Sequence, residues 1–365
     1  MTAKNISIHI WLYPLAWLYE LVIRLRNQLF DWGILHSQSF PLPVICIGNL
    51  TVGGTGKTPH TEYLIRLLCS KQMQTGVLSR GYKRKSKGFQ WAFPSTPMEQ
   101  IGDEPFQMKS KYPFIRLAVD ANRPHGISRM IDPEVYPPLD VILLDDAYQH
   151  RYVKAGMNIL LTDYHRPIYA DTMLPAGRLR EPFSGAKRAD IIIVSKCPDS
   201  ISPEEAEIIR QHLNPSFAQE IFFSTLSYGT LYAFKRPSLT RSLESLKPET
   251  PVFILTGIAT PDRLLNDIKS YTTNIYSICF PDHHSFTNTD AEKINREFRK
   301  KPKGTIIITT EKDATRLTHL SLSEDVWQNL YILPVEVKFL FGQEPMFNKK
   351  ITHYVGTYSR NSSIS

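Results

Sequence analysis

The sequence contains few cysteines, and they lie far apart. Its 365 residues include four of them, with no Cys-x-x-Cys or Cys-His pairing: Cys46, Cys69, Cys197 and Cys279. This spacing argues against a zinc site or a disulfide framework and fits a reducing cytosol. We expect all four cysteines to lie in the core.

The sequence also lacks an uninterrupted apolar run long enough to span a membrane. Its most apolar segment, residues 6–23, is broken by His9, Pro14 and Glu20, whereas a spanning helix needs about 20 predominantly apolar residues. No small-residue cleavage site follows the segment, so a signal peptide is not expected. Its aromatic residues and the two arginines that follow are typical of a helix lying in a bilayer surface. The alternative is a helix that packs on the protein's own core.

The composition is that of a folded chain with a positive net charge. Hydrophobic residues make up 42% of the chain and aromatic residues 11%, which excludes an intrinsically disordered protein. The formal net charge of +8 favours anionic partners, such as nucleic acid, acidic lipids or phosphorylated small molecules. Nucleic acid is the weakest of these, because no RNP-like, helix-turn-helix or zinc-finger pattern is present.

Short aliphatic runs alternate with helical segments from residue 42 onward. The first set of runs lies at residues 44–47, 76–78, 114–119, 141–144, 158–161 and 191–194. Such runs predict a mostly parallel sheet with helices on both faces. A second set predicts a smaller α/β domain whose first two strands pair with each other: 221–224, 231–234, 252–255, 275–278 and 305–308.

The strongest motif, at residues 48–58, follows the first predicted strand and begins a helix. Its glycines let backbone N–H groups turn toward phosphate oxygens, and the helix N-terminus favours negative charge. Lys57 is expected to reach the β- and γ-phosphates, and the Thr58 hydroxyl to hold Mg²⁺. The motif departs from the GxxxxGK[ST] pattern because Thr51 stands where a glycine is expected. The candidate nucleotide-binding residues are Thr51, Val52, Gly53, Gly54, Thr55, Gly56, Lys57 and Thr58.

A second motif places two carboxylates at the end of the strand predicted at 141–144. Because this end lies at the same sheet edge as the phosphate loop, Asp145 or Asp146 is expected to bind or orient the metal. A third segment, residues 79–87, is rich in Lys and Arg and follows the strand at 76–78. It is either a solvated charged loop or a site for phosphate or an anionic membrane surface.

Three further clusters of residues are predicted to form turns. They are the acidic Gly-Asp-Glu-Pro at 102–105, the Pro- and Gly-rich loop at 174–182, and the segment at 280–286 with two adjacent histidines. Each is a surface turn by default. A histidine at a strand end can instead assist a carboxylate base.

Taken in order, these motifs resemble those of the tetraacyldisaccharide 4'-kinases, also called lipid A 4'-kinases. The resemblance covers nearly the whole chain and includes the segments at 48–59, 79–85, 102–105, 145–150, 174–182, 280–286 and 309–317. It implies transfer of the ATP γ-phosphate to the 4'-hydroxyl of a tetraacylated glucosamine disaccharide 1-phosphate in lipid A biosynthesis, with Mg²⁺ required. It also implies a location at the cytoplasmic face of the bacterial inner membrane, with no nucleic acid and no obligate protein partner.

The resemblance further implies the domain organisation and the site residues. A membrane-associated helix at 1–28 precedes a P-loop NTPase-like kinase domain at 29–215, a smaller α/β domain at 216–350 that closes over the active site, and a tail at 351–365. Asp103 and His283 are the implied catalytic pair, with His284 as the rival histidine. The implied substrate and active-centre residues are Arg80, Tyr82, Gln149, His150, Arg180 and Glu181.

The main alternative is a membrane-docked P-loop nucleotide switch that acts on a partner protein. A GTP-dependent switch would need an N/T-K-x-D motif. The closest string, at residues 310–313, has its lysine directly followed by aspartate. This spacing weighs against GTP, and a helix cap built from Thr310 and Asp313 explains the same string.

Overall fold

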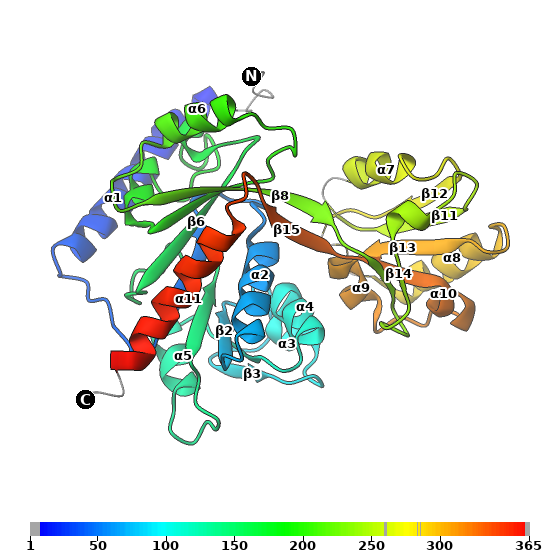
Figure 1. Cartoon of the computed structure of the whole chain (residues 1–365), viewed down its shortest axis with the longest axis horizontal. Helices are drawn as coiled ribbons and strands as arrows, with labels where there is room; N and C mark the ends of the chain where they lie inside the picture. Colours follow the sequence, from blue (N-terminus) through cyan, green and yellow to red (C-terminus); the bar gives the residue numbers. More distant parts are fainter. Residues whose placement is uncertain (1–7, 259–260, 283, 285, 362–365) are drawn as a thin grey trace. The chain divides into compact units, whose positions relative to one another are not determined.

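The computed structural model describes residues 8–258, 261–282, 284 and 286–361. The chain forms two compact units (Figure 1). The larger unit runs to Leu226 and resumes at Val337, and the smaller unit comprises Ser227–Glu336. Strands β8 (Glu220–Tyr228) and β15 (Val335–Phe339) carry the chain from one unit to the other and back.

The larger unit is built on a nine-stranded sheet in the order β15-β8-β7-β6-β1-β5-β2-β4-β3. Neighbouring strands from β8 to β4 are parallel, and β3 is paired antiparallel to β4. This confirms the predicted mostly parallel sheet. Its other strands are β1 (Val44–Asn49), β2 (Thr75–Ser79), β3 (Gln90–Ala92), β4 (Arg116–Val119), β5 (Val141–Asp145), β6 (Met157–Asp163) and β7 (Ile191–Ser195).

Both faces of this sheet are covered by helices, as continuous aliphatic strands require. Along β1, Val44 and Cys46 belong to one buried cluster, while Ile45 and Ile47 belong to another on the opposite face. Helices α5 (Arg123–Met130) and α6 (Pro203–Leu213) contribute to the first cluster. The second cluster receives α2 (Lys57–Ser70), α4 (Asp103–Lys111) and α11 (Glu344–Asn361), and α11 lies beside α2 in Figure 1. A short helix, α3 (Met98–Ile101), directly precedes α4.

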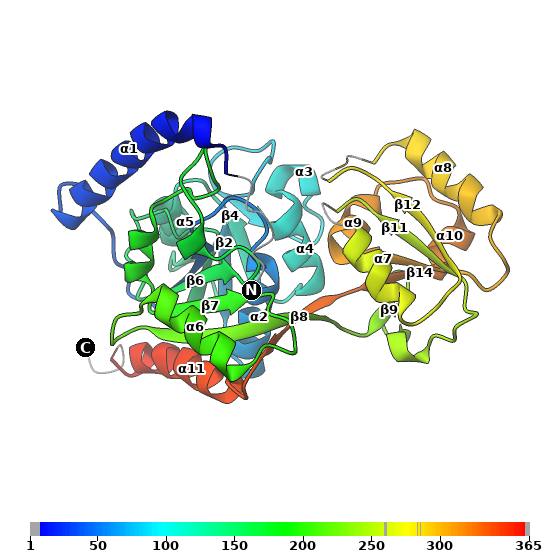
Figure 2. The same cartoon turned by 90° about the horizontal axis from the view of Figure 1, so that it is seen from above.

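The N-terminal helix lies on the surface of the larger unit (Figure 2). A single 3-10 turn (Ile10–Leu12) leads into α1 (Tyr13–Asp31), in which only Ala16 and Phe30 are buried. Within the described part of the chain, no helix has the length and apolarity needed to cross a membrane. The outward side carries a group of exposed apolar and aromatic residues: Ile10, Trp11, Tyr13, Leu15, Trp17, Leu18, Leu21, Val22 and Leu25.

The smaller unit has its own six-stranded sheet in the order β10-β9-β14-β13-β11-β12. The strands from β14 to β12 are parallel, and β9 is antiparallel to both of its neighbours. Two buried clusters flank this sheet. Its elements are β9 (Leu231–Ala233), β10 (Thr240–Arg241), β11 (Val252–Thr256), α7 (Pro261–Lys269), β12 (Ile275–Cys279), α8 (Asn288–Arg299), β13 (Ile306–Thr310), α9 (Glu311–Leu317), α10 (Glu324–Asn329) and β14 (Leu330–Leu333).

The units divide at positions other than those expected from the sequence. The expected pairing of the strands at 221–224 and 231–234 is wrong, because β8 pairs with β7 in the large sheet and β9 with β14 and β10 in the small one. Residues 337–350 return to the larger unit, and 351–361 continue a helix instead of a tail. Phe347, Ile351 and Val355 repeat every four residues along α11 and are buried, which fastens this helix to the core.

The cysteines differ in their environments. Cys46 and Cys197 are buried as expected, and burial raises the pKa of both thiols to about 12. Cys69 is half-buried and Cys279 is exposed, so the expectation that all four lie in the core is wrong. Cys279 is the last residue of β12, which is an edge strand of the small sheet.

Candidate functional site

The glycine-rich loop connects β1 to α2 at the C-terminal edge of the large sheet. Gly53 and Gly56 have φ angles of +107° and +82°, a region that glycine adopts without steric cost. Gly56 is the N-cap residue of α2, so Lys57 and Thr58 are the first two residues of the helix. The loop therefore ends at a helix N-terminus, where backbone N–H groups and the helix dipole favour an anion.

Asn49, the last residue of β1, holds the loop from inside. Its side chain is fully buried and its Nδ2 donates to the hydroxyls of Thr55 at 2.9 Å and Thr51 at 3.3 Å. Gln149 Nε2 donates to the Asn49 carbonyl at 2.7 Å. This role of Asn49 was not predicted from the sequence, although a polar residue at the end of a buried strand is an indication of it. On the other side of the loop, Lys196 donates to the Gly54 carbonyl and to Asp163.

Asp145 ends β5 beside the loop. Its oxygens accept hydrogen bonds from Thr61 on α2 at 3.1 Å and from Ser79 at the end of β2 at 3.3 Å. Burial is the main cause that raises the pKa of Asp145 to about 6, and the charges of Asp146 and Glu104 add to it. Thr61 was not singled out from the sequence, and Ser79 appeared only as the first residue of the basic segment at 79–87. Both follow from the strand order, because β1, β5 and β2 are neighbours.

Asp146 occupies a different electrostatic environment. Arg180 Nη2 lies 3.0 Å and Lys57 Nζ 3.7 Å from Asp146 Oδ1. Burial alone would raise the pKa of this carboxyl, but the charges of Lys57 and Arg180 outweigh burial and lower it. Two adjacent carboxyls with pKa values moved in opposite directions are typical of a functional centre.

The structure brings the segments that contain Tyr82 and Asp103 together. A Cβ on Gly102 would lie 2.9 Å from the Tyr82 carbonyl oxygen, and one on Gly81 would lie 2.7 Å from the Ile101 carbonyl oxygen. The two backbones approach so closely that both positions need glycine. Asp103 follows as the first residue of α4, while Tyr82 is exposed. Arg80 is exposed as well.

A buried carboxylate joins α4 to α2. Glu62 on α2 accepts hydrogen bonds from Gln107 at 2.8 Å and from Lys111 at 2.6 Å. The two donors follow Asp103 on α4 at intervals of four residues and therefore lie on one face of the helix. Glu62 is thereby a contact through which the helix beginning at Lys57 holds the helix beginning at Asp103.

The loop at 174–182 packs against the phosphate loop. Thr51 and Leu179 form an antiparallel bridge, and Arg180 N donates to the Leu50 carbonyl at 2.7 Å. The Arg180 guanidinium also donates to Asn49 Oδ1. Glu181 is fully buried and ion-paired with Arg188 at 2.6 Å.

His150 follows Gln149 in the segment after β5. Burial and the charge of Arg123 lower the pKa of His150. Its ring packs edge-on against Tyr152 with centroids 5.7 Å apart. The imidazole is therefore kept neutral at physiological pH.

His283 lies outside the described residues. Its neighbour His284 is in the smaller unit, where it stacks on Phe280 with ring centroids 4.7 Å apart and its Nε2 lies 3.0 Å from Asp290 Oδ2. Asp290 is also the capping-box residue of α8, which begins after Thr287. His284 is thus engaged in packing and capping within its own unit.

Within the larger unit, the predicted residues gather at one sheet edge, and further polar residues join them. The site residues that were not predicted from the sequence share one feature, which is a place at the end of a strand or in the first two turns of a helix: Asn49, Thr61, Ser79, Glu104 and Lys196. The histidine pair belongs to the smaller unit.

Comparison with known proteins identifies the relatives of this arrangement. The family described as "Tetraacyldisaccharide-1-P 4'-kinase" matches residues 8–355. A protein named tetraacyldisaccharide 4'-kinase from Phocaeicola vulgatus is 50% identical over 367 residues, with all of both chains covered. A protein of the same name from Bacteroides fragilis is 51% identical and is covered to 98%, and one from Flavobacterium johnsoniae is 47% identical over 94% of this chain and 96% of its own.

A solved structure has the same fold. The crystal structure titled as the "apo" form of LpxK from Aquifex aeolicus in complex with ATP superposes with a TM-score of 0.73 and 29% identity, over 94% of this chain and 98% of that one. The similarity therefore extends over nearly the whole of both chains. On this evidence, the chain belongs to the tetraacyldisaccharide-1-P 4'-kinase family.

Proposed function

We propose that this protein is an ATP-dependent lipid kinase. It transfers the γ-phosphate of ATP to the 4'-hydroxyl of a tetraacylated glucosamine disaccharide 1-phosphate, which forms the 4'-phosphate in lipid A biosynthesis. The observation that carries the proposal is the glycine-rich loop with Lys57 beside Asp146, in a chain similar over its whole length to proteins named tetraacyldisaccharide 4'-kinase. A nucleotide switch acting on a partner protein is not favoured by these relatives.

The phosphates of ATP are held by the loop amides of residues 51–58 and by Lys57. Phosphoryl transfer requires little covalent work from the protein, so positioning and charge neutralisation dominate. Lys57, Arg180 and the α2 N-terminus supply positive charge around Asp146. These groups favour the charge that develops on the transferring phosphoryl oxygens.

The oxygen ligands at the start of α2 and the end of β5 suit Mg²⁺. Thr58, Asp145 and Asp146 offer a hydroxyl and two carboxylates, and Mg²⁺ prefers hard oxygen donors with the rest of its shell from substrate phosphates and water. Among the described residues, no group of three His, Cys, Asp or Glu side chains forms a protein-only metal site, which agrees with a shared shell. The raised pKa of Asp145 fits a carboxyl whose charge a cation would stabilise. When bound, Mg²⁺ neutralises phosphate charge.

The proton of the acceptor hydroxyl needs a base. We assign this role to Asp103, with His283 acting on the same proton or orienting the carboxylate. The 4'-oxygen forms a bond to the γ-phosphorus, the bond from that phosphorus to the bridging oxygen of ADP breaks, and the hydroxyl proton passes to Asp103. Because the two residues belong to different units, the smaller unit would close over the acceptor during the reaction.

The remaining predicted residues fit the acceptor side. Arg80 and Tyr82 are exposed beside the backbone that precedes Asp103, where they can meet the disaccharide and its 1-phosphate. Arg180 and Gln149 contact Asn49 and so orient the phosphate loop. Glu181 directly follows Arg180 and His150 directly follows Gln149 in the chain, and each helps to hold its neighbour in place.

We further propose that the protein docks on the cytoplasmic face of the bacterial inner membrane through α1. The exposed apolar face of this helix includes Trp11, Trp17 and Leu21, and aromatic residues beside basic ones favour the membrane interface. Its lipid substrate is a component of that membrane. No protein partner is required by this scheme.

A direct assay tests the proposed function. The purified full-length protein is incubated in detergent micelles with Mg²⁺, γ-labelled ATP and tetraacyldisaccharide 1-phosphate, and the lipids are separated by chromatography. A labelled 4'-phosphorylated lipid is expected from the wild type, and Lys57→Ala should form it about 10²–10³-fold more slowly. Absence of a labelled lipid with the wild type would rule out the proposed function, and ATP hydrolysis without lipid labelling would favour the nucleotide switch.

A further inference from the structure

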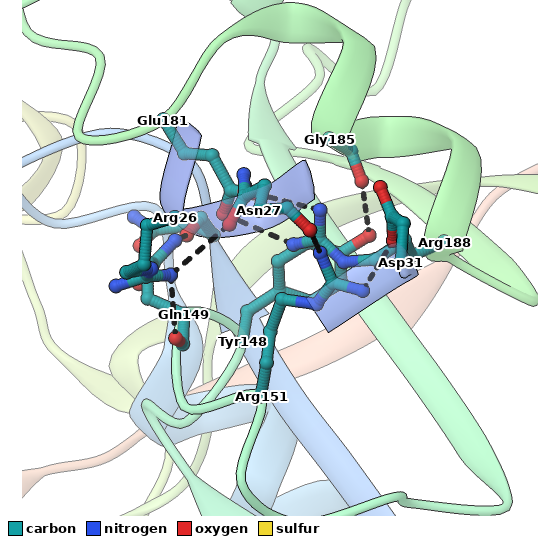
Figure 3. A network of polar contacts seen from close by, with 10 residues as sticks. Arg26, Asn27, Asp31, Tyr148, Gln149, Arg151, Glu181, Gly185 and Arg188 are labelled. Carbon is teal, nitrogen blue, oxygen red and sulfur yellow. Dashed lines mark hydrogen bonds and ion pairs between the residues drawn. The ribbon is translucent and has the colours of Figure 1, made fainter. Parts of the chain in front are cut away.

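The inner side of α1 makes polar contacts with the two segments that flank the phosphate loop (Figure 3). Asn27 Nδ2 donates to Glu181 Oε1 at 2.6 Å, and Arg26 Nη2 donates to the Gln149 carbonyl at 3.0 Å. About two helical turns before them, the Tyr19 hydroxyl donates to the Arg180 carbonyl at 3.1 Å. The same helix that exposes an apolar outer face is thus bound on its inner face to residues of the candidate site.

Glu181 receives these contacts in a fixed geometry. Its side chain is fully buried and accepts two hydrogen bonds from Arg188, at 2.6 and 3.0 Å, in addition to the one from Asn27. A bidentate pair fixes the orientation of both planar groups. The attraction of Glu181 raises the pKa of Arg188 despite its burial. Removing the Asn27 side chain therefore leaves the charge of Glu181 paired. It deletes the hydrogen bond from α1 to Glu181 and the 3.3 Å hydrogen bond that Arg26 Nη2 donates to Asn27 Oδ1.

Arg180, the chain neighbour of Glu181, connects this segment to the phosphate loop. Its backbone N–H donates to the Leu50 carbonyl and its carbonyl accepts from Tyr19. Its guanidinium donates to Asn49 and, at 3.0 Å, to Asp146. One residue thus joins α1, the loop and the strand-end carboxylate.

We propose that Asn27 is a positioning residue for phosphoryl transfer. By holding Glu181, it fixes the backbone from which the Arg180 guanidinium reaches Asp146 and Asn49. Asn27 itself does not touch ATP or the lipid. The inference rests on the proposed kinase function and adds to it a residue on the helix whose other face is assigned to the membrane.

A second contact of α1 provides the control. Asp31, at the end of the same helix, is ion-paired with Arg151 at 2.6 Å. In the described part of the chain, its carboxylate forms no hydrogen bond or ion pair with residues 180–181. Asp31→Asn weakens the attachment of α1 and removes a charge that acts on Arg188, but it deletes neither partner of the Asn27–Glu181 hydrogen bond. A purely structural role for the α1 contacts predicts that Asn27→Ala and Asp31→Asn have the same effect on activity.

The experiment measures kcat, the KM for ATP and the melting temperature of full-length variants in detergent micelles, where bilayer docking does not contribute. Loss of one hydrogen bond to a charged group predicts that Asn27→Ala lowers kcat about tenfold, whereas Asp31→Asn leaves kcat within about twofold. Asn27→Asp, which places a second carboxylate beside Glu181, should lower kcat further. In an Arg180→Ala background, Asn27→Ala should change kcat by less than about twofold, because the two residues act as a unit.

The outcomes separate the inference from the proposed function. An active wild type with unchanged kcat in Asn27→Ala would overturn the inference alone. Equal losses in Asn27→Ala and Asp31→Asn, or losses that multiply in the Arg180→Ala background, would do the same. A wild type that does not label the lipid would overturn the proposed function, and the inference with it.

Discussion

Lys57 Nζ and Asp146 Oδ1 lie 3.7 Å apart, so the first residue of α2 faces the residue that directly follows β5. Arg180 reaches the same oxygen from the other side. Asp146 therefore keeps both cations at the loop, where the phosphates of a nucleotide would lie. We expect Lys57 and Arg180 to exchange part of their contact with Asp146 for phosphate oxygens when ATP binds.

This arrangement predicts the effect of removing Lys57. Lys57→Ala should lower kcat by about 10²–10³-fold, because a preorganised charge at the phosphoryl group is typically the largest catalytic contribution. Asp146 retains Arg180 as a partner, so the melting temperature should change little. Labelled-lipid assays and calorimetry on the same preparation check both points. Activity close to that of the wild type would remove the loop lysine from the mechanism.

The two strand-end carboxylates predict opposite effects on stability. The pKa of Asp145 is about 6 in the folded protein, above its ordinary value of 3.8, so the wild type loses stability as the pH rises from about 4 to 6. The pKa of Asp146 is lowered, so its carboxylate contributes stability above its ordinary pKa that is lost as the pH falls.

At pH 7.5, without nucleotide and with a chelator, Asp145→Asn should therefore raise the melting temperature and Asp146→Asn should lower it. Near pH 4 the gain from Asp145→Asn should disappear, because the wild-type carboxyl is then protonated. Melting curves across this pH range provide the measurement. Two variants that shift in the same direction would contradict the charge environments described for the pair. In both variants, activity should also respond less to added Mg²⁺ than it does in the wild type.

The sequence was sufficient to predict the local elements of the site. The aliphatic run of β1, the glycine-rich loop and Lys57 are contiguous, and so are the run of β5 and its two aspartates. Local periodicity and turn chemistry determine such segments. The family resemblance, which the comparisons confirm, was needed to predict the site residues in turns, because their local sequence shows no periodic pattern.

Contacts between distant segments could not be predicted in this way. The bridge between Thr51 and Leu179 and the hydrogen bond from Asn27 to Glu181 join residues far apart in the chain. The pairing of β8 with β7 likewise depends on which strand edge is free, not on the composition of β8. The buried face of α11 had a readable four-residue period at Phe347 and Ile351, but polar residues between them obscured it.

The contact between α2 and α4 predicts a measurable contribution to stability. Glu62→Gln removes the negative charge that pairs with Lys111, and the Glu62 side chain is only 3% exposed. We expect the free energy of unfolding to fall by about 2–3 kcal/mol, the range for a hydrogen bond to a charged group in a buried pair. Lys85→Ala, which removes the exposed pair with Glu99, should change it by less than about 1 kcal/mol. Denaturant titrations that give equal losses would show that Glu62 does not hold the two helices together.

The exposed face of α1 predicts membrane binding that is separable from folding. Trp17 and Leu21 are 69% and 51% exposed, so Trp17→Ser with Leu21→Ser should leave the melting temperature within a few degrees. Binding to vesicles that contain anionic lipid should fall strongly, because apolar area that enters the interface is lost. Flotation assays measure this binding. A large fall in melting temperature would instead indicate that this face is covered in the folded protein.

The proposed pair of Asp103 and His283 predicts a coupled loss of activity. Asp103 begins α4 in the larger unit, and the histidine belongs to the sequence of the smaller one. Asp103→Ala should lower kcat by about 10²–10⁴-fold, the range for a positioned acid–base group. If both residues serve one proton, the double variant with His283→Ala should lose little more.

The neighbouring histidine is the matched control for that cycle. His284 stacks on Phe280 and pairs with Asp290, so His284→Ala should lower the melting temperature while the kcat of the folded fraction stays within about threefold. His283→Ala should also change the acidic limb of the pH–rate profile, because an imidazole coupled to a carboxylate alters its titration. Losses from Asp103→Ala and His283→Ala that simply multiply would mean independent roles. A larger loss of kcat in His284→Ala than in His283→Ala would transfer the assignment to His284.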